Sequence, residues 1–147
     1  MQFVYCFLIL SLFGITGCAT RGSLPDSVAE IDFNGPVGKT GWAEYQRTEF
    51  YPGVKVDKVR ILARQSLSQG GFDVFRDDPS SGCVMGEHGY TTVDWNIVMG
   101  VYYQQESAGV RIRYVVEASK DIGFMGDATE RDWISEVNAR IRIGLEL

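Results

Sequence analysis

Few side chains in this sequence could support catalysis or bind a metal. It contains one histidine, His88, and three cysteines, of which Cys83 is the nearest to His88 along the chain. A thiol nucleophile needs a base within reach, but five positions separate the two residues, and on one regular strand they would point to opposite faces. We therefore expect Cys83 to be a small buried hydrophobic residue. His88 is expected to lie on the surface, near a strand end.

Carboxylates near His88 offer a second chemical possibility. Glu87 and Asp94, with Cys83 and His88, supply enough ligand atoms for a metal ion. These residues match no known zinc spacing, so we expect neither a metal nor another cofactor.

The stretch from Ser119 to Ala128 combines Asp121 and Asp127 with two glycines and the pair Phe124-Met125. Two carboxylates could act as the acid and base of a glycosidase, but that chemistry needs a sugar cleft, and nothing in the sequence indicates one. Alternatively, the stretch is a connector whose apolar pair lies under the last helix.

Aromatic side chains are the third group of candidates, because such residues dominate binding hot spots. The candidate binding residues are Trp95, Tyr102, Tyr103, Phe124 and Trp133. Strand alternation places Trp95 and Tyr103 on one face and Tyr102 on the other. In a small sheet such residues can instead fill the core, and both interpretations stay open.

Hydrophobic periodicity predicts the elements that position these residues. Apolar residues at three- and four-residue steps from Val56 to Leu67 predict an amphipathic helix, which Gly70-Gly71 would end. Strands are expected at 42–50, 72–75 and 83–87. Alternation over 95–104 and 110–118 predicts an antiparallel hairpin, with Arg111 and Arg113 on one solvated face.

A last helix is expected after residue 128. Thr129 and Asp132 have the spacing of a capping box, with Thr129 as the N-cap. The buried stripe of this helix would consist of Ile134, Val137, Ile141 and Leu145. Strands grouped between two helices predict an α+β fold, with an antiparallel sheet of about four to five strands packed against two helices in two layers.

Composition narrows the class of protein. The chain has 147 residues, 45% of them hydrophobic and 22% charged, with a formal net charge of −5. This balance is that of a globular domain. The acidity argues against a nucleic-acid partner, because phosphate contacts require a basic face.

The N-terminal eighteen residues have the properties of a targeting segment. Residues 3–15 are uninterrupted by charge, and the first charged side chain is Arg21. This run is shorter than the roughly 20 apolar residues that a transmembrane helix needs, so a secretory signal is expected. Its n-region has no Lys or Arg. The polar stretch 18–30, with Gly22, Ser23 and Pro25, predicts a tether, followed by one domain over 31–147.

The residues Ile15-Thr16-Gly17-Cys18 resemble the lipobox of bacterial lipoproteins. The resemblance implies cleavage after Gly17, a diacylglyceryl thioether on Cys18 and acylation of the new amine, which together attach the chain stably to a membrane. Ala19 rather than Asp after the cysteine favours the outer membrane facing the periplasm. In an organism with a single membrane, the anchor would be in the cell membrane.

A looser resemblance concerns the folded part. The helix ending in Gly-Gly-Phe-x-Val, the residues 82–86 and the closing helix are similar to the helix-grip domains of small envelope lipoproteins, such as the C-subunit lipoprotein of the outer-membrane barrel assembly machine. We expect a lipid-anchored envelope protein, not an enzyme, whose domain binds another envelope protein or a small envelope ligand, or acts as a scaffold. A sheet face or edge strand would be the contact surface. The alternative is an envelope-polymer hydrolase that uses Asp121, Asp127 or His88.

Overall fold

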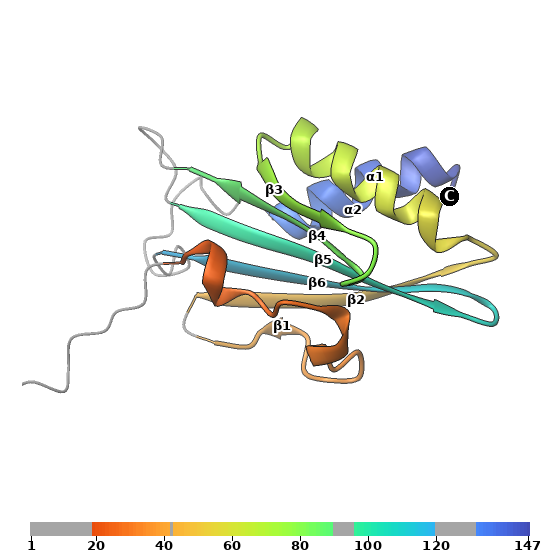
Figure 1. Ribbon diagram of the computed structural model, residues 1–147, viewed down its shortest axis with the longest axis horizontal. Helices are drawn as coiled ribbons and strands as arrows, with labels where there is room; N and C mark the ends of the chain where they lie inside the picture. The colour runs from red at the N-terminus through yellow and green to blue at the C-terminus, as the bar shows by residue number, and fades with distance from the viewer. Residues whose placement is uncertain (1–18, 42, 90–95, 120–131) are drawn as a thin grey trace, which may run out of the picture.

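A computed structural model describes residues 19–41, 43–89, 96–119 and 132–147. It has the expected α+β organisation, with one antiparallel sheet and two helices on one face of that sheet (Figure 1). The elements are β1 (Gly38–Lys39), β2 (Glu44–Pro52), α1 (Val56–Gln69), β3 (Asp73–Asp78), β4 (Cys83–His88), β5 (Ile97–Glu106), β6 (Gly109–Ala118) and α2 (Trp133–Leu145), preceded by two short 3-10 helices, Arg21–Ser23 and Val28–Glu30.

The sheet has six strands in the order β1-β2-β6-β5-β4-β3. The expectation of four to five strands was wrong, since the two-residue strand β1 is too short to produce a periodic pattern. The predicted hairpin is confirmed: β5 and β6 pair from Ile97 opposite Ala118 to Glu106 opposite Gly109. Gly109 is required at the turn, because a Cβ there would lie 2.1 Å from the carbonyl oxygen of Tyr51.

Helix α1 follows the predicted pattern and ends where the glycines predict. The apolar positions Val59, Ala63 and Leu67 are buried. Gly71 has φ +88°, a conformation that side chains with a Cβ rarely adopt. It lets the chain reverse into β3 at once.

Helix α2 begins later than the sequence predicted. Its N-cap is Asp132, whose carboxylate accepts a hydrogen bond from the Ser135 backbone N–H at 2.9 Å. Asp132 was expected inside the helix, with Thr129 as the cap, and Thr129 lies outside the described residues. A carboxylate can satisfy the unpaired N–H groups of the first turn directly. The predicted stripe Ile134, Val137, Ile141 and Leu145 is buried.

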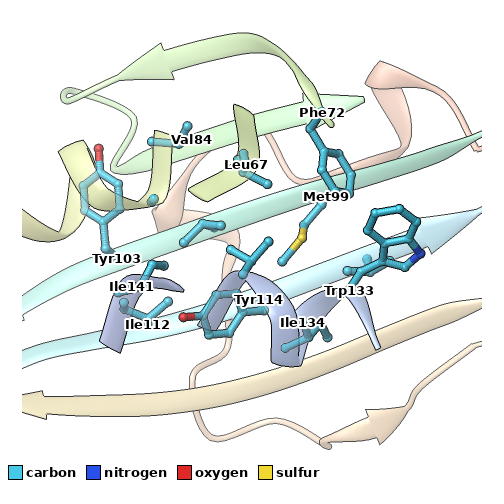
Figure 2. Packing of buried hydrophobic residues seen from close by; sticks show 14 of the residues in the cluster. Leu67, Phe72, Val84, Met99, Tyr103, Ile112, Tyr114, Trp133, Ile134 and Ile141 are labelled. Carbon is cyan, nitrogen blue, oxygen red and sulfur yellow. The ribbon is translucent and has the colours of Figure 1, made fainter. Parts of the chain in front are cut away.

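The main core lies between the sheet and the two helices. Figure 2 shows Met99, Tyr114 and Ile141 packed together there, with Phe72 and Trp133 near one end. The strands contribute every second side chain to this cluster, as alternation predicts. The central residues of this cluster are fully buried, as in a close-packed protein interior.

The opposite face of the sheet is covered by the N-terminal segment, defined here as residues 19–37 (Figure 1). Ala19 and Leu24 are 1% and 5% exposed and pack on a second apolar cluster that includes Met85 and Tyr102. Residues 19–30 therefore do not form the free tether expected from their polar composition. The fold has a third layer, and the packed body begins before residue 31.

Arg113 binds the N-terminal segment to the sheet. It was expected on a solvated face with Arg111, but it is 1% exposed. Its guanidinium donates to the carbonyl oxygens of Gly35 and Pro36 and to the side chains of Gln46 and Thr48. Because every bond replaces one to water, the charge is tolerated inside the protein. Burial lowers the pKa of the Arg113 guanidinium.

Candidate functional site

The proposed lipidation residues, Gly17 and Cys18, lie outside the described residues. The described chain starts at Ala19, which is already buried. Within the described ranges, no helix is both long and apolar enough to cross a bilayer. The lipobox therefore stays a prediction from the sequence.

The aromatic candidates do not form a recognition surface in the described part of the chain. Tyr102, Tyr103 and Trp133 are at most 4% exposed. As alternation predicted, Tyr103 packs in the helix-covered cluster and Tyr102 in the opposite one, so the core alternative holds for these three residues. Trp95 and Phe124 lie outside the described residues.

Tyr102 instead fastens the N-terminal segment. Its hydroxyl donates to the carbonyl oxygen of Pro25 at 2.7 Å, and burial raises the pKa of this phenol. The proton is therefore retained at physiological pH, and the hydroxyl acts as a permanent donor. Tyr102 links the sheet to the N-terminal segment.

Cys83 and His88 point to opposite faces of β4, as their spacing predicted. Cys83 is fully buried beneath the N-terminal segment, with its Sγ 3.9 Å from the carbonyl oxygen of Asp26. Burial raises the pKa of the Cys83 thiol to about 11, so the thiol stays protonated and is a poor nucleophile. These two residues cannot form a nucleophile–base pair.

The His88 ring packs among aromatic side chains at the end of β4. Its centroid lies 5.7 Å from that of Phe72 and 4.8 Å from that of Trp133. His88 is half-buried rather than on the surface, and its buried Nδ1 has no hydrogen-bond partner within the described part of the protein. The imidazole acts there mainly as a flat packing group.

The carboxylates proposed for a hydrolase, Asp121 and Asp127, lie outside the described residues. Among the residues that the structure does describe, no three His, Cys, Asp or Glu side chains cluster in a way that could hold a metal ion. Glu87, one of the carboxylates considered for a metal, is bound to Arg21 and Asn96 instead.

A groove lined mostly by charged and polar residues lies between α1 and the edge strand β3. It has a volume of about 400 Å³ and is lined by Arg60, Ile61, Arg64, Gln65, Ser68, Gln69 and Asp77. We call it the α1–β3 groove. The sequence did not predict the groove, because Asp77 reaches it from a strand that follows the helix.

Asp77 organises the charges of the groove. Its carboxylate accepts a hydrogen bond from Arg60 Nη1 at 2.8 Å and lies 3.5 Å from Arg64 Nη1. One carboxylate against two guanidiniums leaves a positive charge, and the Arg64 side chain is 63% exposed. Ile61, 49% exposed, adds an apolar wall. The groove can therefore bind an acceptor-rich group that has an apolar neighbour.

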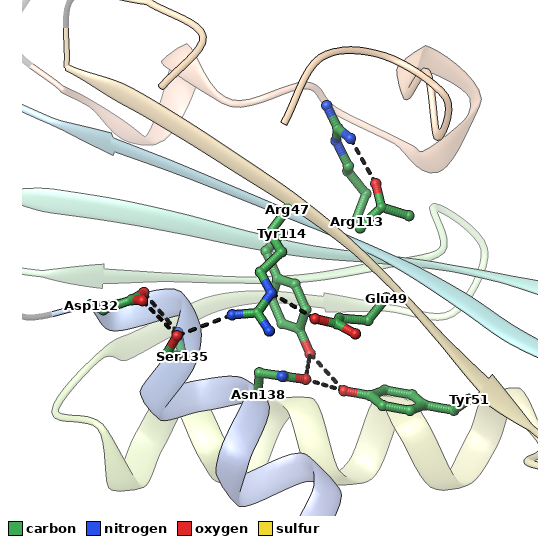
Figure 3. A network of polar contacts seen from close by, with 9 residues as sticks. Arg47, Glu49, Tyr51, Arg113, Tyr114, Asp132, Ser135 and Asn138 are labelled. Atoms are coloured by element: carbon green, nitrogen blue, oxygen red, sulfur yellow. Dashed lines mark hydrogen bonds and ion pairs between the residues drawn. The ribbon is translucent and has the colours of Figure 1, made fainter. Parts of the chain in front are cut away.

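A second polar cluster joins the sheet to α2 inside the main core. The hydroxyls of Tyr51 and Tyr114 both donate to Oδ1 of Asn138, and the two hydroxyl oxygens are 3.2 Å apart (Figure 3). Burial raises the pKa of both phenols. Local patterning did not indicate this cluster, because Asn138 lies between the apolar positions of α2.

Arg47 extends these contacts at the rim. It donates to Glu49 at 2.6 Å and to the Ser135 hydroxyl at 3.0 Å, and Ser135 in turn bonds to Asp132 (Figure 3). The chain of bonds fixes the first turn of α2 against β2. We assign these residues to stability rather than to binding, because their hydrogen bonds join the sheet to α2.

Comparisons with known proteins identify no family. No protein-family model matches the sequence, and no curated protein matches it. Among solved structures, CalU16 from Micromonospora echinospora has a TM-score of 0.43 at 10% identity, over 71% of this chain and 87% of that one. TTHA0849 from Thermus thermophilus has a TM-score of 0.36 at 13% identity, over 70% and 94%.

Proposed function

We propose that this chain is a lipid-anchored envelope protein whose α+β domain binds another envelope protein without catalysing a reaction. The lipid anchor is proposed from the motif Ile15-Thr16-Gly17-Cys18, which stands at the end of the apolar run 3–15. Ala19 after the cysteine supports an outer-membrane location facing the periplasm, or the cell membrane where only one membrane exists. We also infer a helix-grip arrangement, since both helices cover one face of an antiparallel sheet.

The binding surface that the geometry favours is the α1–β3 groove. Both faces of the sheet are covered, one by the helices and the other by the N-terminal segment. Arg64 projects exposed guanidinium donors, and Gln65, Ser68 and Gln69 surround it. An acidic side chain or chain end of the partner fits this charge and polarity.

Strand addition at the neighbouring sheet edge is less favourable than groove binding. The edge strand β3 carries four charged residues, Asp73, Arg76, Asp77 and Asp78, and its register shifts between Val74 and Arg76. Charges and bulges on an edge oppose pairing with another strand. We therefore place the partner contact on side chains of the groove.

The anchor is tested by labelling cells with palmitate and isolating the protein. The wild type is expected to incorporate label, and Cys18→Ala is expected to abolish it. Cys6→Ala is the matched control, because Cys6 lies in the apolar run that cleavage removes, and it should label like the wild type. Label that persists in Cys18→Ala would reject the anchor.

The groove is tested by crosslinking in detergent-solubilised envelopes, followed by recovery of the protein with its partner. Arg64→Glu reverses the exposed charge and is expected to reduce recovery of the crosslinked partner severalfold. Lys58→Glu is the control, because Lys58 is an exposed residue of α1 outside the groove. Equal losses in both variants would show that charge on the helix matters but the groove does not.

A further inference from the structure

The N-terminal segment is attached to the sheet from its first described residue. The carbonyl oxygen of Ala19 accepts a hydrogen bond from Asn96 Nδ2 at 2.9 Å, and both residues are buried. Asn96 Nδ2 also donates to Glu87 Oε1 at 2.9 Å. These bonds place Ala19 beside the strand end His88 and the strand start Ile97, which pair with each other.

The residues that follow Ala19 are also held. Arg21 donates to Glu87 at 2.6 Å and to Asp73 at 3.3 Å, and its guanidinium lies over the Phe75 ring. Leu24 is buried, and the Pro25 carbonyl accepts from Tyr102. The segment therefore has no slack between Ala19 and Pro25 that could act as a spacer.

The position of Ala19 limits how far an anchor on the preceding residue can be from the domain. Consecutive Cα atoms are only about 3.8 Å apart. Acyl chains on Cys18 would lie in the hydrocarbon, and the sulfur would lie at the level of the headgroups. The part of the sheet around Ala19 must then reach the headgroups as well.

We propose that one end of the sheet, the proximal end, contacts the lipid headgroups directly. This proposal rests on the proposed lipid anchor. This proximal end is formed by Ala19, Glu87, His88 and Asn96, where β4 ends and β5 begins (Figure 1). The distal end is the turn between β5 and β6, where Gly53 N–H donates to the Ala108 carbonyl at 2.8 Å. The ten residues of β5 separate the ends by about 30 Å.

This orientation leaves the α1–β3 groove accessible. Asp77 pairs with Val84, which pairs with Val101. Val84 is four residues from His88 along β4, or about 13 Å. A partner in the groove would approach from beside the domain, above the headgroups, rather than from the bilayer.

The proposal is tested by fluorescence quenching with the lipidated protein in phosphatidylcholine vesicles whose headgroups carry a nitroxide. The same thiol-reactive fluorophore is attached to Gly89→Cys, next to the proximal end, or to Ala108→Cys at the distal turn. Both positions are exposed, and a Cβ at Gly89 has no neighbour within 4 Å. The unsubstituted protein controls for labelling of Cys83, which is buried.

We expect quenching to be severalfold stronger at Gly89→Cys than at Ala108→Cys. A spacer of about twelve Gly and Ser residues between Cys18 and Ala19, spanning about 20 Å, should remove most of that difference. Equal quenching at the two sites, or a difference that the spacer leaves unchanged, would overturn the orientation.

Palmitate incorporation into the same preparations separates the two proposals. Equal quenching in a protein that carries palmitate rejects the orientation and leaves the anchor intact. A protein without palmitate rejects the anchor and the orientation together. Quenching at Gly89→Cys that is strong without the spacer and weak with it supports both.

Discussion

Nη1 of Arg113 lies 2.6 Å from the Thr48 hydroxyl oxygen and thereby joins β6 to β2 from the side of the N-terminal segment. The same guanidinium reaches the carbonyls of Gly35 and Pro36. One buried cation therefore connects two strands and the loop that crosses them. Its burial depends on oxygen atoms contributed by residues far apart in the sequence.

Arg113→Gln is expected to lower the free energy of unfolding by about 2–3 kcal/mol, because it leaves buried acceptors without donors. Urea unfolding followed by tryptophan fluorescence measures the change. Arg111→Gln is the control on the same strand, since Arg111 forms a half-exposed ion pair with Glu106. It should lower the free energy of unfolding much less than Arg113→Gln does. Equal losses would contradict the assigned role of Arg113.

Tyr114→Phe is expected to destabilise the protein by about 1–2 kcal/mol, because the buried Asn138 oxygen loses a donor. Tyr51→Phe removes the other donor to the same oxygen. Since the two hydroxyls share one acceptor, the double variant should differ from the sum of the single variants. Additive losses in urea unfolding would show that the hydroxyls act independently.

Cys83 is expected to resist thiol reagents in the folded protein. The test uses Cys6→Ser/Cys18→Ser, in which Cys83 is the one remaining thiol, and a chromogenic disulfide reagent at pH 8. Reaction should be slow in buffer and fast in urea, where the thiol is exposed and its pKa returns to about 8.5. Fast reaction of the folded protein would contradict the burial of Cys83 under the N-terminal segment.

The raised pKa of Cys83 also predicts that the free energy of unfolding falls as the pH rises. Folding favours the protonated thiol, so its contribution is complete below the unfolded pKa of about 8.5. The contribution is lost as the pH rises toward the folded pKa of about 11. We compare the Cys6→Ser/Cys18→Ser variant with the same variant that also carries Cys83→Ala. Between the unfolded and folded pKa values of Cys83, the urea midpoint should fall more steeply with pH in the variant that keeps Cys83.

Glu87 should make stability depend on pH in the acid range. Hydrogen bonds from Arg21 and then Asn96 lower the pKa of the Glu87 carboxyl. A lowered pKa gives stability that is present above the unfolded value of about 4.3 and is lost as the pH falls through the folded value. Arg21→Gln should therefore reduce the urea midpoint at pH 7 more than at pH 3.

Lys58→Gln is the control for this prediction, because it removes one positive charge on α1 rather than beside Glu87. Any reduction of the urea midpoint by Lys58→Gln should be similar at pH 7 and at pH 3. A loss in Arg21→Gln that stays constant from pH 7 to pH 3 would show that the contact with Glu87 is not responsible.

Local patterns in the sequence predicted the helices and the central hairpin well. The burial of Val59, Ala63 and Leu67 and the pairing of β5 with β6 depend on side-chain periods that a short stretch reveals. The end of α1 at Gln69, just before Gly70-Gly71, follows from the conformational freedom of glycine. These features need no knowledge of the rest of the chain.

Features that depend on distant partners were missed. Arg113 looks solvated until the carbonyls of Gly35 and Pro36 are placed beside it. The N-terminal segment looks like a tether, because its few apolar residues have no regular period. The α1–β3 groove requires Asp77 opposite Arg60, and local periodicity carries no information about that approach.

The two sheet edges affect how copies of the domain behave when they are crowded. One edge strand, β1, has two residues, and the other, β3, carries charges and a bulge. The β3 edge therefore presents no long, flat row of free backbone groups to a second molecule, whereas β1 pairs with only Tyr45 and Gln46 of β2. If the proposed anchor confines many copies to one plane, contact between their β3 edges would not lead to strand pairing.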